Sequence, residues 1–186
     1  MRGMDVTDAE LVGRFQRGDR EAFARLTARW QDRAYALAYR LTVDADEADD
    51  ITQSAMLRAY KGLAGFNGRS SFSTWLHRVV VNLCRDRERT LSRREKTIHG
   101  VSGSRRVGPD LAPPPDEAGE RADMSDTVAR AVAALPEDMR ETVVLKYYQG
   151  LKLVEVAEIV DAPISTVKSR LARGLVLLRE ALENKQ

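Results

Sequence analysis

The sequence predicts an all-α protein in which two small helical domains are joined by a flexible linker. Ala, Leu, Arg and Glu dominate the composition and favour helices, whereas aromatic residues make up only 6% of the chain. Apolar residues recur at helical spacing towards both ends, and no segment has the character of a strand. Residues 97–123 break this pattern with several glycines and a run of prolines, which is typical of a tether. We therefore place the domains at 1–96 and 124–186.

The amino-terminal domain is predicted to begin with two helices. Thr7 and Glu10 match a capping box, in which a hydroxyl and a carboxylate satisfy backbone N–H groups at the start of a helix. Gly18 and Asp19 end this first helix and start the second. From Arg20 onward, apolar residues recur at steps that place them on one helix face, namely Phe23, Leu26, Trp30, Ala34, Leu37 and Leu41.

Two further helices complete this domain. Asp44 is predicted to cap the third helix, which ends near Gly62. A loop at residues 65–71 leads into a fourth helix that begins around Ser73, is apolar at first and then becomes strongly basic. The loop and helix combine aromatic, amide and basic side chains, namely Phe66, Phe72, Trp75, Arg78, Asn82, Arg85 and Arg89. This combination suits single-stranded nucleic acid, whose unstacked bases need a pocket or a stacking surface. The alternative, which we favour for Phe72 and Trp75, is that these aromatic residues belong to the core.

The carboxy-terminal domain is predicted to contain four helices. A short amphipathic helix starts near Ser125, and Pro136 suits the first turn of the next. We expect the core of that second helix to come from Val143, Val144, Tyr147 and Tyr148, and Gly150 to end it. Residues 154–160, a tight turn at 161–163 and a last helix from Ser165 to about Leu182 have helix-turn-helix form. Ser165 is expected to cap the last helix, and its buried face is predicted to consist of Ile164, Val167, Leu171, Leu175, Leu178 and Leu182.

The helix-turn-helix leaves polar and basic residues facing outward near the start of its second helix. In such motifs this part of the helix enters the major groove, where lysine and arginine neutralise phosphates or contact guanine edges. The outward residues are Thr166, Lys168, Ser169, Arg170 and Arg173. We favour DNA binding over the alternative of an ordinary helical hairpin with a basic surface, and the pattern does not distinguish base contacts from phosphate contacts.

Charge and reactive residues narrow the functional class. The net charge is only +2, but a basic stretch at 69–106 is flanked by acidic stretches at 44–50 and 110–126, a separation typical of partner-binding surfaces. A single cysteine, Cys84, excludes a disulfide framework, and two distant histidines make a metal site improbable. We expect no cofactor and no catalytic site. No apolar run is long enough to span a membrane, so we expect a cytoplasmic protein without membrane contact of its own.

Three segments, taken in order, resemble the extracytoplasmic-function (group IV) sigma factors of bacterial RNA polymerase. Residues 44–60 look like the helix that binds core polymerase in this family. Residues 66–76, continuing through Arg78 to Asn82, resemble its promoter-melting and minus-ten-reading segment. Residues 157–171 resemble its minus-thirty-five-reading helix-turn-helix. The likeness covers both predicted domains, so it implies an alternative sigma factor that directs promoter-specific initiation.

The resemblance also implies partners and site residues. Core RNA polymerase would contact Asp49, Asp50, Gln53 and Leu57. The minus-ten element, read as a flipped base of the melted non-template strand, would contact Phe66, Asn67, Ser70, Ser71, Arg78, Asn82 and Arg85. Duplex DNA of the minus-thirty-five element would contact Ser165, Thr166, Lys168, Ser169, Arg170 and Arg173. An anti-sigma factor that covers both domains is the expected regulator.

The chain departs from the family pattern at four positions. Asn67 and Arg69 stand where a basic and then an acidic residue are common, which affects the choice of minus-ten base. Asp161 and Ser165 stand where glycines are common, and Asp161 is predicted to adopt a left-handed backbone conformation. Two alternatives to a sigma factor remain: a stand-alone helix-turn-helix transcriptional regulator that binds a palindrome as a dimer, and a helical adaptor that binds only protein. An enzyme is the weakest alternative.

Overall fold

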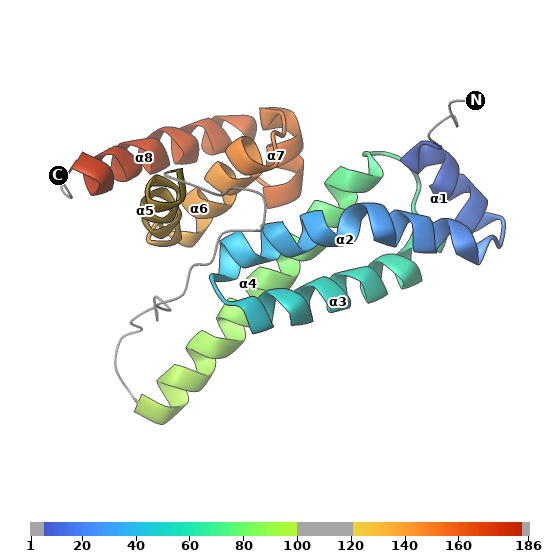
Figure 1. Ribbon diagram of the computed structural model, residues 1–186, viewed down its shortest axis with the longest axis horizontal. Helices are drawn as coiled ribbons and strands as arrows, with labels where there is room; N and C mark the ends of the chain where they lie inside the picture. The colour runs from blue at the N-terminus through green and yellow to red at the C-terminus, as the bar shows by residue number, and fades with distance from the viewer. Residues whose placement is uncertain (1–5, 100–120, 184–186) are drawn as a thin grey trace.

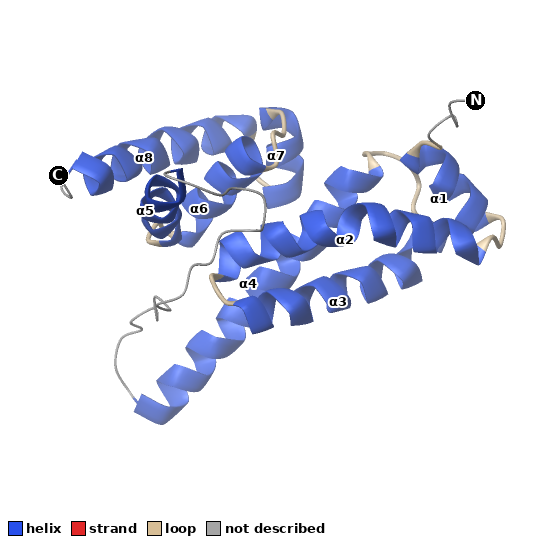
Figure 2. Ribbon diagram, in the orientation of Figure 1, coloured by secondary structure: helices blue, strands red, loops and turns tan. Residues whose placement is uncertain are grey.

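The computed structural model describes residues 6–99 and 121–183, and every element in these ranges is helical (Figures 1 and 2). The amino-terminal unit contains α1 (Asp8–Gln16), α2 (Arg20–Thr42), α3 (Ala45–Gly62), a short η1 (Leu63–Gly65) and α4 (Phe72–His99). The carboxy-terminal unit contains α5 (Arg121–Ala133), α6 (Glu137–Val143), η2 (Val144–Tyr148), α7 (Leu153–Val160) and α8 (Ile164–Glu183). The predicted all-α fold is confirmed. Because α4 continues to His99 and α5 begins at Arg121, both helices extend into the predicted linker, whose residues 100–120 lie outside the described ranges.

Side-chain caps set the starts of the first three helices, as the sequence predicts. The Thr7 hydroxyl accepts a hydrogen bond from the backbone N–H of Glu10, and the Glu10 carboxylate accepts one from the backbone N–H of Thr7. Asp19 caps α2 by accepting from the N–H groups of Glu21 and Ala22. Asp44 caps α3 by accepting from the N–H of Glu47. Each cap satisfies backbone donors that a helix start leaves without an intrahelical partner.

The first three helices and the start of α4 enclose a core at the amino-terminal end of the molecule. Its buried side chains come from all of these helices and from η1, and they include Leu11, Leu26, Trp30, Leu63, Phe72 and Leu76. The indole N–H of Trp30 donates to Asp8 at 2.9 Å, so the polar atom of this large side chain has a partner. This core fixes the start of α4 and the loop that precedes it against α1 and α2.

The buried face of the last helix, α8, agrees with the prediction at four positions and differs at two, since Leu171 and Leu182 are partly buried against the core along with Val167 and Leu178. Val167 and Leu178 are buried as expected, but Ile164 and Leu175 are each 40% exposed. Gly174 takes the contact instead, because a Cβ at that position would lie 3.2 Å from Cγ2 of Val143. The missing side chain lets the two helices approach closely at this position. The prediction that Ser165 caps α8 is also wrong, since the helix already begins at Ile164.

The prediction that Tyr147 and Tyr148 belong to the core is wrong because the helix changes its repeat at this point. Residues 144–148 form a π-helical turn that continues directly from α6. A π-helix has a wider repeat than an α-helix, so the apolar period read from the sequence loses its register there. Val144 and Leu145 are therefore buried, whereas Tyr147 and Tyr148 are 56% and 40% exposed.

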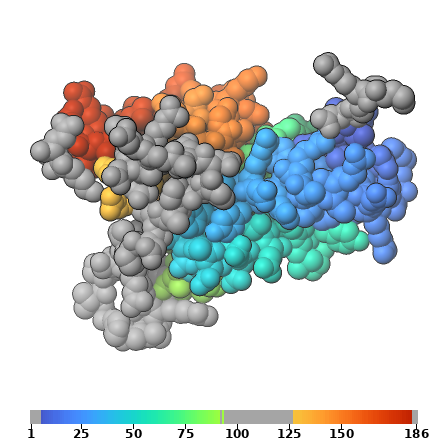
Figure 3. Space-filling view, in the orientation of Figure 1, coloured from blue at the N-terminus to red at the C-terminus, as the bar shows by residue number. Residues whose placement is uncertain are grey.

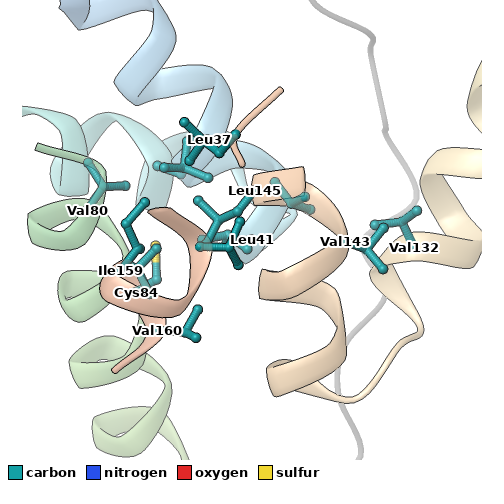
Figure 4. Close-up of a cluster of buried hydrophobic side chains, with 14 of the residues drawn as sticks. Leu37, Leu41, Val80, Cys84, Val132, Val143, Leu145, Ile159 and Val160 are labelled. Carbon is teal, nitrogen blue, oxygen red and sulfur yellow. The ribbon is translucent and has the colours of Figure 1, made fainter. Parts of the chain in front are cut away.

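The two helical units pack against each other, which the sequence does not predict. Helix α7 lies on α4, and α2 contacts η2, α5 and α6. Figure 4 shows Leu41 and Cys84 of the amino-terminal unit beside Leu145, Ile159 and Val160 of the carboxy-terminal unit. In the space-filling view of Figure 3, the orange surface of the carboxy-terminal unit adjoins the blue surface of α2. Buried side chains of both units thus form one continuous apolar cluster.

Candidate polymerase and nucleic-acid interfaces

Helix α3 presents an exposed face that mixes carboxylate, amide and apolar groups. Its inner face is fixed by four buried residues at helical spacing, Ala48, Ile51, Ala55 and Ala59. Asp49, Asp50, Gln53 and Leu57 lie on the opposite side, and all four are exposed. Leu57 is 55% exposed although it is a large apolar residue. The structure therefore brings the four predicted polymerase-contact residues together on one accessible strip.

The loop before α4 is held in shape by local hydrogen bonds. The Asn67 side-chain oxygen accepts from the backbone N–H of Arg69 at 3.2 Å, and Gly68 between them has a φ of 71°, which favours glycine. The Ser71 hydroxyl accepts from the backbone N–H of Thr74 at 3.0 Å and so caps α4. Ser70 is half-buried in the same loop. These contacts fix Asn67, Ser70 and Ser71 around one short turn.

Aromatic side chains pack between this loop and the core of the amino-terminal unit. The ring of Phe66 lies 5.3 Å from that of Trp75, centroid to centroid, and the Phe66 carbonyl accepts a hydrogen bond from the Gln16 side chain at 2.8 Å. Phe72 is buried and Trp75 is half-buried, in agreement with the expectation that these two residues belong to the core. Phe66 is half-buried.

On the basic face of α4, two of the predicted DNA-contact residues are exposed and one forms an ion pair with α6. Arg78 and Asn82 are exposed one turn apart. Arg85, one turn further, donates from Nε and Nη2 to the two oxygens of Glu141 at 2.7 and 2.6 Å. Glu141 lies on α6, and its side chain is only 3% exposed. This hydrogen bonding raises the pKa of Arg85 above its usual value, so the guanidinium stays charged.

The outward face of α8 carries the predicted minus-thirty-five residues. Ser165, Lys168, Ser169 and Arg173 are exposed, and Thr166 is half-buried. Arg170 is half-buried and pairs with Asp138 of α6 at 3.1 Å. The turn before α8 contains Asp161 with φ 54° and ψ 53°, so the left-handed conformation predicted there is present.

Sequence reasoning missed the acidic partners of two predicted site residues. Glu141 is 56 positions from Arg85, and Asp138 is far from Arg170 on a different helix. Neither pair has a local sequence signal, because each depends on how separate helices pack. Both acidic residues follow Pro136 in a segment for which the sequence indicates only a favourable interaction with the helix dipole.

The described residues contain no cluster suited to metal chemistry. Among them, no three His, Cys, Asp or Glu side chains gather closely enough to hold a metal ion. No helix in residues 6–99 and 121–183 is long and apolar enough to cross a membrane. The fold and the exposed faces together define a helical DNA-binding protein with a carboxy-terminal helix-turn-helix and a separate polar-apolar strip on α3.

Comparisons with known proteins assign this class to a family. Residues 26–94 match the model of sigma-70 region 2, and residues 125–178 match that of sigma-70 region 4. The ECF RNA polymerase sigma factor SigW of Bacillus subtilis is 33% identical, with 97% of this chain and 100% of that protein covered. The RNA polymerase sigma-H factor of Pseudomonas aeruginosa is 34% identical, with 95% and 94% covered. The ECF RNA polymerase sigma-E factor of Escherichia coli is also 34% identical, with 97% and 94% covered.

Solved structures show the same fold. The sigma factor RpoE in complex with the anti-sigma factor NepR, from Bartonella quintana, matches with a TM-score of 0.75 at 23% identity, covering 89% of this chain and 99% of that one. CnrH in complex with the cytosolic domain of CnrY matches with a TM-score of 0.70 at 23% identity, covering 96% and 99%. The chain belongs to the ECF family of RNA polymerase sigma factors, and its function is that of an alternative sigma factor in transcription initiation. The resemblance noted in the sequence is thereby confirmed.

Proposed function

We propose that this sigma factor binds core RNA polymerase through the exposed face of α3 and reads two promoter elements with α4 and α8. The observation that carries the proposal is that the three predicted residue sets lie at three separate places, on α3, on α4 with the loop before it, and on α8, in a chain related over nearly its whole length to ECF sigma factors. We further propose that the protein acts in the cytoplasm and performs no catalysis of its own. Synthesis of RNA would belong entirely to the polymerase.

The α3 face suits a basic protein surface with an apolar centre. Asp49 and Asp50 supply negative charge, and Gln53 offers both a hydrogen-bond donor and an acceptor. Leu57 adds an apolar group that the fold leaves 55% exposed. Large exposed apolar residues beside charges are typical of protein interfaces, where an apolar centre is surrounded by a polar rim. We therefore assign this strip to core polymerase.

The loop at residues 66–71 suits an extruded base of the melted strand. A flipped base needs hydrogen bonds to its edge and an aromatic or apolar surface for its face. Asn67, Ser70 and Ser71 supply polar groups around the turn, and Phe66 supplies an aromatic ring beside it. Arg78 and Asn82 continue along α4 as exposed groups for the adjoining phosphates. We propose that Arg85 extends this surface once it leaves Glu141.

The exposed start of α8 suits the major groove of duplex DNA. Lys168 and Arg173 bring positive charge, and Ser165, Thr166 and Ser169 bring hydroxyls that contact phosphates or base edges. Arg170 would take part in the same contact, although Asp138 holds it in the free protein. Its contribution therefore requires the exchange of a carboxylate for a phosphate or a guanine edge.

An anti-sigma factor is the proposed regulator. A sigma factor of the same fold, RpoE, has been solved with the anti-sigma factor NepR, and a second protein of this fold, CnrH, has been solved with the cytosolic domain of CnrY. We propose that an anti-sigma protein likewise binds this chain and covers its polymerase and DNA surfaces. The proposed domain limits, 1–96 and 124–186 with a linker at 97–123, would let such a partner contact both units.

Co-purification with core RNA polymerase tests the proposal. The full chain and core polymerase are mixed and separated by size exclusion, together with a variant carrying Asp50→Lys and Leu57→Lys. Glu21→Lys is the matched control, because Glu21 is exposed on α2 and is not one of the proposed polymerase contacts. We expect the wild-type and control proteins to elute with polymerase and the α3 variant to elute alone. Equal co-elution of all three proteins would refute the assignment of α3.

A further inference from the structure

Gln16, the last residue of α1, forms two hydrogen bonds with the segment that leads into the loop at residues 66–71. Its side-chain Nε2 donates to the backbone carbonyl of Leu63 at 3.1 Å and to that of Phe66 at 2.8 Å. Leu63 is the first residue of η1, and Phe66 follows its last residue directly. Because a side-chain amide has two N–H donors, the hydrogens of Gln16 suffice for these two carbonyls. The contact spans 47 and 50 positions of the sequence and attaches the loop to α1.

The bond to the Phe66 carbonyl fixes the direction in which the loop begins. The backbone of Phe66 is extended, with φ −67° and ψ 120°. Its carbonyl and the N–H of Asn67 belong to one planar peptide unit. Holding this carbonyl therefore holds the whole plane and the point from which the Asn67 side chain leaves the backbone. Asn67 is the first of the polar residues proposed to contact the extruded base.

Gln16 stands on a well-packed part of the fold. The ring of Phe15, the residue before it, lies 5.6 Å from that of Phe23 on α2 and 5.3 Å from that of Tyr60 on α3. In Figure 1, α1 lies beside the segment that connects α3 to α4. A group that is held on a packed helix positions its neighbours more precisely than a group on a loop does.

A second contact holds Phe66 from the side of α4. The Phe66 ring lies 5.3 Å from that of Trp75. Trp75 in turn lies against the end of α3, where a Cβ added to Gly62 would come within 3.1 Å of its ring. The side chain of Phe66 is thus fixed by Trp75 and its carbonyl by Gln16.

The hydrogen bonds within the loop have a different effect. The Asn67 side chain accepts from the backbone N–H of Arg69, and the Ser71 hydroxyl accepts from that of Thr74. Each of these bonds joins residues two or three positions apart, so it shapes the turn without attaching it to another helix. Placement of the turn relative to α1 comes from Gln16.

We propose that Gln16 is a positioning residue for the minus-ten site, whose amide holds the loop in the shape that receives the extruded base. Gln16 lies 50 positions before Phe66, outside the segment that the sequence indicates for this element. A loop that is already held in its binding shape loses less conformational freedom when the strand binds, so affinity rises without an added contact. The role in DNA binding rests on the proposed function of the loop, whereas the attachment of the loop to α1 does not.

Hydrogen exchange of the full chain without DNA tests the attachment. Gln16→Met keeps the length of the side chain and removes its donors, and Gln16→Asn keeps the amide but is one methylene shorter. Gln31→Met, at an exposed position on α2, is the matched control. Because a neutral hydrogen bond contributes about 1 kcal/mol, we expect both Gln16 variants to speed exchange in the peptide of residues 62–72 by about fivefold. Peptides from α2 and circular dichroism should match the wild type.

Affinity of the holoenzyme for melted DNA tests the positioning role. The probe is a labelled single-stranded oligonucleotide with the minus-ten element of a promoter found by run-off transcription. An abasic site placed at each position in turn locates the captured base as the one whose loss weakens binding to the wild-type holoenzyme. Gln16→Met should weaken binding of the intact probe by about fivefold, as measured by fluorescence anisotropy. The further loss caused by the abasic site should shrink, because both changes remove the same contact, and non-additivity of this kind reports coupling.

The two measurements separate the possible outcomes. Faster exchange of the loop together with a smaller abasic loss supports the positioning role of Gln16. Loop exchange in both folded Gln16 variants equal to the wild type would overturn it. An abasic loss of the same size in Gln16→Met and in the wild type would also overturn it, because Gln16 would then affect structure alone. If the wild-type holoenzyme binds the intact probe no better than a scrambled one, the proposed function of the loop fails, and the exchange data still decide whether Gln16 holds it.

Discussion

Replacing Leu57 by alanine should weaken binding to core polymerase while sparing most of the stability of the fold. The Leu57 side chain is 55% exposed, so folding buries slightly less than half of it and a partner can bury the rest. Full burial of a leucine side chain is worth about 1.5–3 kcal/mol. About half of this, roughly 1 kcal/mol, is available to binding, which corresponds to a Kd weakened by roughly fivefold. The cost to folding should be of similar size, roughly 1 kcal/mol.

Leu63→Ala is the matched control for this prediction. Leu63 follows α3 directly, but its side chain is fully buried. We expect this change to lower the free energy of unfolding by about 2–5 kcal/mol, because it removes buried atoms and leaves a cavity. The Kd of the folded protein for polymerase should not change. Urea unfolding and fluorescence anisotropy of labelled sigma factor titrated with core polymerase measure the two quantities. A Leu57→Ala variant with wild-type Kd would refute the reasoning.

Three further predictions concern DNA binding, the turn and pH. Lys168→Ala should weaken promoter binding by the holoenzyme and reduce the slope of the logarithm of the binding constant against log salt by about 1. Filter binding at several salt concentrations measures this slope. An unchanged slope would show that Lys168 makes no phosphate contact. Asp161→Gly should raise the urea midpoint because Asp161 has a φ of 54°, whereas Asp161→Val should lower it, and the reverse order would contradict the left-handed turn. Burial raises the pKa of Glu137 from 4.5 to about 7, so the folded chain holds a proton there that the unfolded chain releases, and this group lowers stability as pH rises from about 4.5 to 7. Burial lowers the pKa of His77 from 6.5 to about 4, so this group lowers stability as pH falls from 6.5 to 4. In a Glu137→Gln variant only the His77 effect remains of the two, so its stability, measured by thermal unfolding, should rise with pH between 4 and 6.5. A Glu137→Gln variant that loses stability as pH rises over this range would exclude these two pKa assignments.

Much of the fold follows from local sequence signals. The capping residues Thr7, Asp19 and Asp44 set helix starts through contacts with residues two or three positions away, so they can be recognised without tertiary structure. The left-handed conformation of Asp161 is likewise set within one short turn. The three candidate surfaces follow from segments that each lie on one helix or one loop, and the structure exposes most of their residues.

The errors arise where packing between helices decides the outcome. A strict helical period predicts Leu175 in the core, but the close approach of α6 and α8 places Gly174 there. The π-helical turn at residues 144–148 changes the repeat within a helix that the sequence presents as regular. The pairing of Arg85 with Glu141 joins residues 56 positions apart, and it depends on the contact between two units that the sequence presents as separate. None of these features has a local signal.

Run-off transcription tests the central claim most directly. Core bacterial RNA polymerase is incubated with a genomic DNA library, with and without the full-length sigma factor, and the transcripts are sequenced. The account predicts discrete new transcripts whose start sites share two upstream elements at a fixed spacing, because α4 and α8 each read one element. Transcripts identical with and without the protein, under conditions in which the protein remains folded, would contradict its function as a promoter-directing sigma factor.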